Sequence, residues 1–176
     1  MGFLCLLSQV HTCGVRIVTA RGNIAEEDVD AIVNAANASL ARGAGVCGAI
    51  FAAAGPELDA ACAGLSCSTG EAVATPGFHL PARWVIHAVG PVWQGGDRGE
   101  PDELASCYRR SLEVADELGA RSIAFPALST GIYGYPKREA AEIAVQALRG
   151  AATAVEVARL VAFDAETYDL YRTLLA

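Results

Sequence analysis

Short, continuously apolar segments alternate along this chain with longer segments in which apolar residues recur every three or four positions. The short segments are rich in valine and isoleucine, as expected for strands that are covered on both faces. The predicted strands are 15–19, 31–34, 84–89, 122–125 and 157–163, with weaker candidates at 4–7 and 71–75. The alternation of strand and helix patterns is typical of an α/β protein.

The helical segments have recognisable ends. The segment that starts at Pro101 has one apolar stripe and stops at Gly119, where a C-terminal cap belongs. Pro136 is suited to a helix start, and Asp164 to an N-cap. The predicted helices are 46–54, 56–63, 101–119, 136–150 and 164–175. With no repeat or linker visible, these elements predict one domain over residues 1–176, a three-layer α/β/α sandwich.

Composition narrows the class of protein. The 176 residues are 53% hydrophobic and 19% charged, which excludes a disordered chain. A net charge of −7 argues against general nucleic-acid binding through a basic face. The apolar runs are too short for a membrane span and the start lacks the pattern of a signal peptide, so a cytoplasmic monomer is expected.

The cysteines and histidines do not predict a metal site. Six cysteines form no CxxC pair and are expected to be free thiols in a chain that is large enough to build a core without disulfides. Three histidines stand in no zinc-binding spacing. His87 lies inside an apolar strand pattern, which favours a hydrogen-bonded histidine within the sheet.

The first candidate site is the glycine-rich segment 43–50, Gly-Ala-Gly-Val-Cys-Gly-Ala-Ile. It matches GxGxxG formally, but a dinucleotide site needs these glycines directly after a strand, and residues 35–42 intervene. An acidic residue about 20 positions beyond, at the end of a second strand, is also missing. Small residues before a helix nevertheless expose backbone N–H groups that can bind phosphate.

The second candidate segment, 126–136, leaves the strand 122–125 and enters a helix at Pro136. Open α/β sheets bind their ligands at this end of a strand. Two such loops would suit a diphosphate, and since neither carries Lys or Arg among its glycines, amide dipoles would neutralise the anion. The alternative is that both loops are ordinary tight turns.

Together with segments 30–37 and 85–91, these loops resemble the macrodomain family, near its MacroD-type branch. The resemblance runs from about residue 15 to the C-terminus. It implies a mixed central sheet between helices and a cleft for ADP-ribose. It also implies either binding of ADP-ribosylated targets or hydrolysis of ADP-ribose from proteins, nucleic acids or acetyl esters.

The resemblance assigns a role to each matching residue. Asn23 would contact adenine in place of the usual Asp, and Phe163 would stack on adenine unless it is a core residue. Ile24, beside Asn23, belongs to the same ligand-binding set. Asn37 and Tyr133 would contact the distal ribose, and Asn34 would either join them or brace the loop from behind. The implied amide donors to phosphate are Gly45, Val46 and Gly48 on one loop and Ser129, Thr130, Gly131 and Ile132 on the other.

Cys47 departs from the family pattern, because MacroD-type enzymes carry there an Asp credited with orienting or activating the attacking water. A neutral thiol cannot repeat that role. A cysteine at a helix N-terminus is a setting that favours a reactive thiolate, whereas a free cysteine elsewhere usually serves as a small apolar filler. Cys47 is therefore either a catalytic group, beside Asn37, or a bystander in the ligand-binding set.

Two functions remain open from the sequence. The first is a mono-ADP-ribosyl hydrolase, without a metal or other cofactor, in which positioned water is activated by the ligand's own phosphate. Esters on acidic side chains are the foremost substrates, with O-acetyl-ADP-ribose and nucleobase adducts, including ADP-ribosylated nucleic acid, also open. The second is a reader that binds ADP-ribose or mono-ADP-ribosylated targets without turnover, and Cys47 favours it.

Overall fold

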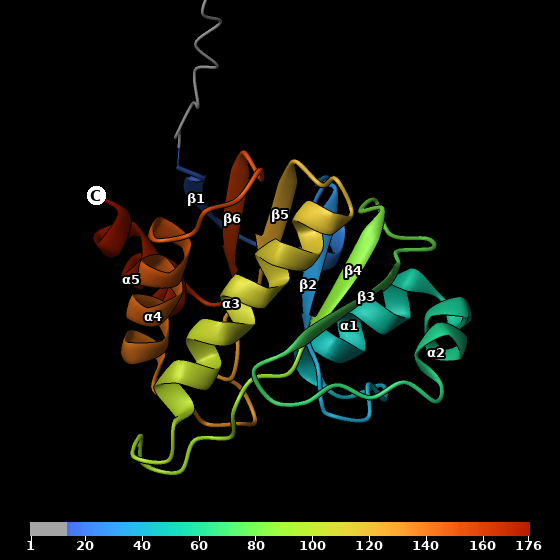
Figure 1. Cartoon of the computed structure of the whole chain (residues 1–176), viewed down its shortest axis with the longest axis horizontal. Coiled ribbons are helices and arrows are strands. Elements are labelled where there is room, and N and C mark those ends of the chain that lie inside the picture. The colour runs from blue at the N-terminus through green and yellow to red at the C-terminus, as the bar shows by residue number, and fades with distance from the viewer. Residues whose placement is uncertain (1–13) are drawn as a thin grey trace, which may run out of the picture.

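The computed structural model describes residues 14–176, and its strands form one sheet in the order β1-β6-β5-β2-β4-β3 (Figure 1). The strands are β1 (Arg16–Arg21), β2 (Ala31–Ala35), β3 (Ala72–Pro76), β4 (Trp84–Ala88), β5 (Ser122–Phe125) and β6 (Val157–Ala162). All neighbouring strands pair in parallel except β3, which runs antiparallel to β4 at the sheet edge. The sheet is therefore mixed, as the resemblance implied.

Helices cover both faces of the sheet, which confirms the three-layer prediction (Figure 1). They are the short 3-10 helix η1 (Ile24–Glu26), α1 (Gly45–Ala54), α2 (Pro56–Cys62), α3 (Glu100–Glu117), α4 (Lys137–Arg149) and α5 (Ala165–Leu175). Alternate residues of β2 point to opposite faces. Ala31 and Val33 join the core beneath α3, α4 and α5, whereas Ile32 joins the core beneath α1 and α2.

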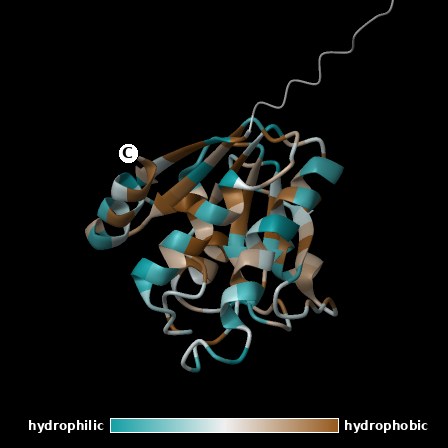
Figure 2. Cartoon of the chain, turned by 60° about the vertical axis from the view of Figure 1, so that its left-hand side comes forward, coloured by the Kyte–Doolittle hydropathy of each residue, from teal (hydrophilic) through white to brown (hydrophobic). Residues whose placement is uncertain are grey.

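Apolar residues gather in the strands, and hydrophilic residues lie on the outer sides of the helices (Figure 2). The central strands are buried on both faces, which explains why they read as continuous apolar runs rather than as alternating patterns. No helix among residues 14–176 has both the length and the apolar character that crossing a membrane requires.

Most predicted boundaries fall within one or two residues of the observed ones, and the differences have local causes. The segment 71–75 forms β3, and the candidate strand 4–7 lies outside the described residues. The last strand ends at Ala162 rather than at Phe163. Pro136 caps α4 instead of starting it, because its ψ of 127° is not helical. Asp164 caps α5 as predicted, by accepting the N–H of Thr167 at 2.9 Å.

The described cysteines are buried and free, in agreement with the expectation of thiols rather than disulfides. They are Cys47, Cys62, Cys67 and Cys107. Within residues 14–176, no group of three or more His, Cys, Asp or Glu side chains is placed to hold a metal ion.

Candidate functional site

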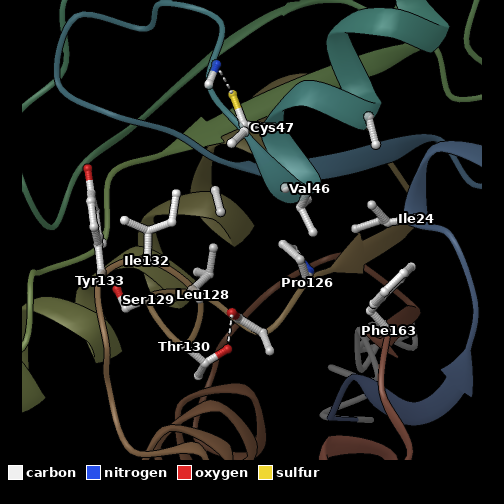
Figure 3. Close-up of a pocket in the computed structure, with 18 of the residues that line it drawn as sticks. Ile24, Val46, Cys47, Pro126, Leu128, Ser129, Thr130, Ile132, Tyr133 and Phe163 are labelled. Carbon is white, nitrogen blue, oxygen red and sulfur yellow. Dashed lines mark hydrogen bonds between the residues drawn. The ribbon is translucent and has the colours of Figure 1, made fainter.

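A cavity of about 810 Å³ lies at the carboxyl edge of the five parallel strands. Each of these strands sends its following segment to the lining, so the sheet itself gathers residues that are far apart in the sequence. Twelve of the fourteen predicted site residues line the cavity, and the two that do not are Asn34 and Gly48. Figure 3 shows Phe163 and Ile24 toward one end and Tyr133 toward the other.

The first wall of the cavity, residues 43–48, is the start of α1. Gly45 begins the helix with a φ of +59°, and the N-cap Ala44 offers no side-chain hydrogen bond. The first helical turn has no preceding carbonyls to accept its amides, so Gly45, Val46 and Cys47 can offer theirs to a ligand. This wall therefore presents the partially positive N-terminus of a helix to the cavity without a charged side chain.

Gly48 lies outside the cavity, for a reason the sequence could not show. Its N–H already donates to the carbonyl of Ala44, in the first hydrogen bond inside the helix. A Cβ at Gly48 would lie 2.7 Å from the carbonyl oxygen of Gly43. The glycine therefore allows the close approach of the preceding loop, and its amide is not available to a phosphate.

The second wall, residues 129–135, is a tight loop that contains two residues in left-handed backbone conformations. Ser129 has a φ of +64° and Gly134 a φ of +71°. Hydrogen bonds from Tyr135 N to Ser129 O and from Gly134 N to Gly131 O close the turn. Within the described part of the chain, the amides of Gly131, Ile132 and Tyr133 have no acceptor. The N–H of Ser129 also has no acceptor there, so these four amides are the free donors of this wall, whereas the N–H and hydroxyl of Thr130 both donate to the carbonyl of Ala127 (Figure 3).

Phe163 and Ile24 form an apolar end of the cavity. Phe163 is 80% exposed, so the alternative that it is a core residue is wrong. A large exposed aromatic side chain at a cavity rim is a ready stacking surface for a flat heterocycle. Asn23 lies beside this end, but its Oδ1 already accepts from Ala25 N at 3.0 Å, which caps η1. One lone pair of that oxygen remains for a ligand.

Asn37 lines the cavity but also stabilises its own loop. Its Nδ2 donates to the carbonyl of Ala41 at 2.9 Å, while its Oδ1 accepts from Ser39 Oγ and Ala41 N. An amide nitrogen carries two hydrogens, so one donor remains for a ligand hydroxyl. The side chain is thus held in place before any ligand arrives.

Behind the first wall lies a buried polar cluster. Asn34 Nδ2 lies 3.6 Å from Cys47 Sγ and 3.2 Å from His87 Nδ1, and His87 Nε2 lies 2.9 Å from Thr75 Oγ1. The Sγ of Cys47 also accepts the N–H of Gly43 at 3.4 Å (Figure 3). Asn34 therefore braces the wall from behind, and its Oδ1 has no partner among the described residues.

His87 is fully buried and hydrogen-bonded within the sheet, as its apolar surroundings in the sequence predicted. Burial lowers the pKa of its imidazole from 6.5 to about 4, because the charged form loses its hydration. It is therefore neutral at physiological pH. The cluster holds Cys47 through neutral hydrogen bonds and not through a charge.

Two charged residues of the cavity were not among the predicted site residues. Lys137 and Asp164 both line it, and Lys137 Nζ lies 3.3 Å from Asp164 Oδ1 and 2.9 Å from Glu166 Oε2. These carboxylates raise the pKa of Lys137, with Glu166 contributing most. The sequence signal that could have identified Lys137 is its position, two residues after the second wall and at the start of α4.

Comparisons with known proteins agree with this architecture. A family model described as Macro domain matches residues 33–144. An O-acetyl-ADP-ribose deacetylase of Klebsiella pneumoniae is 53% identical, over 88% of this chain and 93% of that protein.

Two solved structures are similar in fold and in sequence. The Oceanobacillus iheyensis macrodomain with ADP has a TM-score of 0.85 at 42% identity, covering 89% of this chain and 88% of that one. The Trypanosoma brucei macrodomain in complex with ADP-ribose also has a TM-score of 0.85, at 40% identity, and the match covers 92% of this chain and 69% of that one.

Proposed function

The chain belongs to the macrodomain family, and from this premise we propose that its cleft binds ADP-ribose and that the protein hydrolyses the bond between ADP-ribose and a modified target. The observation that carries the proposal is the pair of amide-lined walls that face one cavity. Free amides in the first turn of a helix and free amides in a loop both bind phosphate, so the two walls can bind the two phosphates of a diphosphate. Adenine would then lie at the Phe163 end and the second ribose at the Tyr133 end.

Backbone amides rather than side-chain cations would neutralise the ligand. Lys137, the cation that lines the cavity, is already paired with two carboxylates. Free N–H groups on both walls supply fixed dipoles that need no rearrangement when the anion arrives. This arrangement lets a protein with a net charge of −7 bind a ligand that is itself an anion.

For the chemical step we infer a water attack assisted by the substrate. In an ester of ADP-ribose, the water oxygen adds to the acyl carbon, the ester bond breaks, and the ribose oxygen takes up a proton. A phosphate oxygen of the ligand can accept the proton that the water loses. The walls and the remaining Asn37 donor would hold the ribose and the phosphate in the geometry that this step needs.

Ester linkages are the favoured substrates. The O-acetyl-ADP-ribose deacetylase relative acts, by its name, on an acetyl ester, and an ester on an acidic side chain presents the same bond. Nucleobase adducts place a different bond at the same end of the cleft. We therefore rank modified acidic side chains and O-acetyl-ADP-ribose before modified nucleic acid.

The second candidate function is that of a reader without turnover. The observation that favours it is Cys47, whose Sγ accepts an N–H from the backbone of Gly43 and lacks the oxygens of a carboxylate. A reader would keep both walls and the Phe163 end, because these bind the ligand. It would release no ADP-ribose.

Turnover distinguishes the two functions. We expect the wild-type protein to release free ADP-ribose from O-acetyl-ADP-ribose and from a protein mono-ADP-ribosylated on acidic side chains, as followed by chromatography. Excess ADP-ribose should inhibit the release, because product and substrate share the cleft. Binding of ADP-ribose without release from either substrate would establish the reader instead.

A further inference from the structure

The second wall is shaped by a neighbouring loop, residues 90–99, between β4 and α3, which we name the bracing loop. The N–H of Trp93 donates to the carbonyl of Tyr133 at 2.8 Å. The rings of Trp93 and Tyr135 lie with their centroids 4.6 Å apart. Trp93 therefore contacts the second wall on both sides of Gly134. Tyr133, to which it is hydrogen-bonded, lies toward the end of the cavity opposite Phe163 (Figure 3).

The bracing loop also meets the other end of the second wall. A Cβ at Gly90 would lie 2.2 Å from the Oγ of Ser129, the residue whose φ of +64° starts the turn. The free amides of the second wall make no hydrogen bonds that could fix their own direction. Two hydrogen bonds within the turn close it on itself, and the bracing loop supplies the contacts that hold the turn from outside at both ends.

The bracing loop is in turn held by one buried carboxylate. Glu100, the first residue of α3, is 2% exposed. Its Oε1 accepts from Gln94 N at 2.9 Å and from Gly96 N at 3.1 Å, and its Oε2 accepts from Arg98 N at 2.7 Å. Gly96 has a φ of +87°, and a Cβ there would lie 2.6 Å from the Trp93 ring.

A carboxylate that accepts three amides fixes the path of the loop between them. The hydrogen bonds from the backbone, its own and those of Arg98, Gly96 and Gln94, keep the pKa of the Glu100 carboxyl below its ordinary value. It is therefore ionised at neutral pH. Because Gly96 lies against the indole, the path that Glu100 fixes also fixes the position of the Trp93 ring.

We propose that Trp93 and Glu100 are positioning residues for the ribose end of the cleft, which hold Tyr133 in place and thereby favour ligands that carry the distal ribose over ADP. Neither residue lines the cavity. Their effect passes through the Trp93–Tyr133 hydrogen bond and the Trp93–Tyr135 ring contact. A prearranged wall needs no ordering when the ligand binds, and this raises affinity without a new contact. The inference rests on the proposed function.

The test compares two ligands on the same variants by calorimetry. Trp93→Ala should weaken ADP-ribose binding about tenfold and ADP binding by a clearly smaller factor, because both ligands use the amides of the second wall whereas only ADP-ribose places a distal ribose beside the Tyr133 side chain. Trp93→Phe, which keeps a ring on Tyr135, should retain most of the preference for ADP-ribose. Val92→Ala, an exposed neighbour on the same loop, is the matched control and should change neither affinity.

Glu100→Gln gives a second route to the same answer if Trp93→Ala does not fold. The amide keeps the size of the side chain but replaces one acceptor by a donor that faces backbone N–H groups. It should weaken ADP-ribose binding about threefold and ADP binding by less. Equal losses for both ligands, or no loss for either, would overturn the positioning role.

The two proposals fail in different ways. If the wild-type protein binds neither ADP-ribose nor ADP, the proposed function is wrong and the positioning role is wrong with it. If the wild-type protein binds both and the variants shift both affinities equally, only the positioning role is wrong.

Discussion

The two walls of the cleft obtain their free amides in different ways. In the first wall, residues 43–48, the amides of Gly45 to Cys47 are free because a helix has no turn before its first one. In the second wall, residues 129–135, a turn with left-handed conformations at Ser129 and Gly134 leaves the amides of Gly131 to Tyr133 without an acceptor. A helix imposes the first geometry, whereas the second depends on particular residues and on the bracing loop.

This difference indicates where the sequence can vary without loss of binding. The hydrogen bonds of α1, with the left-handed Gly45 at its start, fix the amides of the first wall. The side chain at position 47 does not set the path of this backbone, so a cysteine there leaves the amides in place. The second wall is held by the hydrogen bonds of its own turn and by the bracing loop rather than by a helix. Substitutions in the second wall or in the bracing loop should therefore lower ligand affinity more than substitutions of side chains in the first wall.

The largest expected effect is that of a carboxylate in the second wall. Gly131→Glu should lower ADP-ribose affinity about 100-fold or more, because the side chain places a negative charge and bulk where the free amides face the diphosphate. A Cβ at Gly131 meets no atom within 4 Å, so the fold should survive.

Gly131→Ala is the matched control for this variant, since it adds the Cβ without the charge. Calorimetry with both variants, together with their thermal unfolding, checks the prediction. A folded Gly131→Glu protein that binds ADP-ribose as tightly as Gly131→Ala would place the diphosphate elsewhere.

The next effect concerns the polar cluster behind the first wall and appears as a pH dependence of stability. Because the folded-state pKa of His87 is about 4 and the ordinary value is 6.5, the unfolded chain takes up the proton first as the pH falls. This contribution to stability is full above pH 6.5 and is lost progressively down to pH 4. Between pH 7 and pH 5, the free energy of unfolding should fall by about 2 kcal/mol.

Urea unfolding at the two pH values measures this loss. His87→Gln cannot titrate in this range, so its free energy of unfolding should change far less between pH 7 and pH 5, whatever its absolute stability. The same pH dependence in the variant and in the wild type would mean that His87 is not the group responsible.

A smaller effect, on turnover, is expected from a substitution of Asn37, which lies near the start of the loop that leads from β2 to the first wall. Asn37→Ala should lower turnover of an ADP-ribose ester by about tenfold, a loss of roughly 1.4 kcal/mol in transition-state stabilisation, since the ribose loses a positioned donor. Steady-state kinetics checks this, and Ser39→Ala, which removes only the hydroxyl that donates to Asn37 Oδ1, is the control. An unchanged rate for Asn37→Ala would remove this side chain from the mechanism.

The smallest effect is expected at Cys47. Its Sγ is held by Gly43 N and Asn34 Nδ2, and the residue is only 6% exposed. If only the backbone of the first wall matters, Cys47→Ala should keep turnover within about threefold, because it removes no general base. A thiolate nucleophile predicts near-total loss of rate at unchanged ADP-ribose affinity, together with inactivation by a thiol alkylating reagent.

Much of this molecule could be predicted from its sequence. Continuous apolar runs located the central strands, and end signals such as Asp164 located the helices, because both follow from local chemistry. The antiparallel direction of β3 could not be derived from residues 71–75, since it depends on which strand they meet. The role of Phe163 was equally open, because composition does not tell whether an aromatic residue that follows a strand turns inward or outward.

The site shows the same division. The glycine-rich sequences predicted both walls. Gly48 was predicted to be an amide donor to phosphate, but because α1 begins at Gly45, the N–H of Gly48 donates to the carbonyl of Ala44 inside the helix. Lys137 could not be assigned to the site from sequence, because its approach to the cavity depends on how α4 leaves the second wall. Tertiary contacts of this kind, including those of Trp93 with Tyr133 and Tyr135, join segments far apart in the chain, and neither segment's sequence indicates that it meets the other.

The measurement that tests the central claim most directly is a calorimetric titration of the wild-type protein with free ADP-ribose. The account predicts saturable binding at one site, with a dissociation constant in the micromolar range, about −8 kcal/mol. It also predicts a higher melting temperature in the presence of the ligand, because ADP-ribose would bind the folded state alone. No heat of binding and no thermal shift at millimolar ADP-ribose would contradict the account.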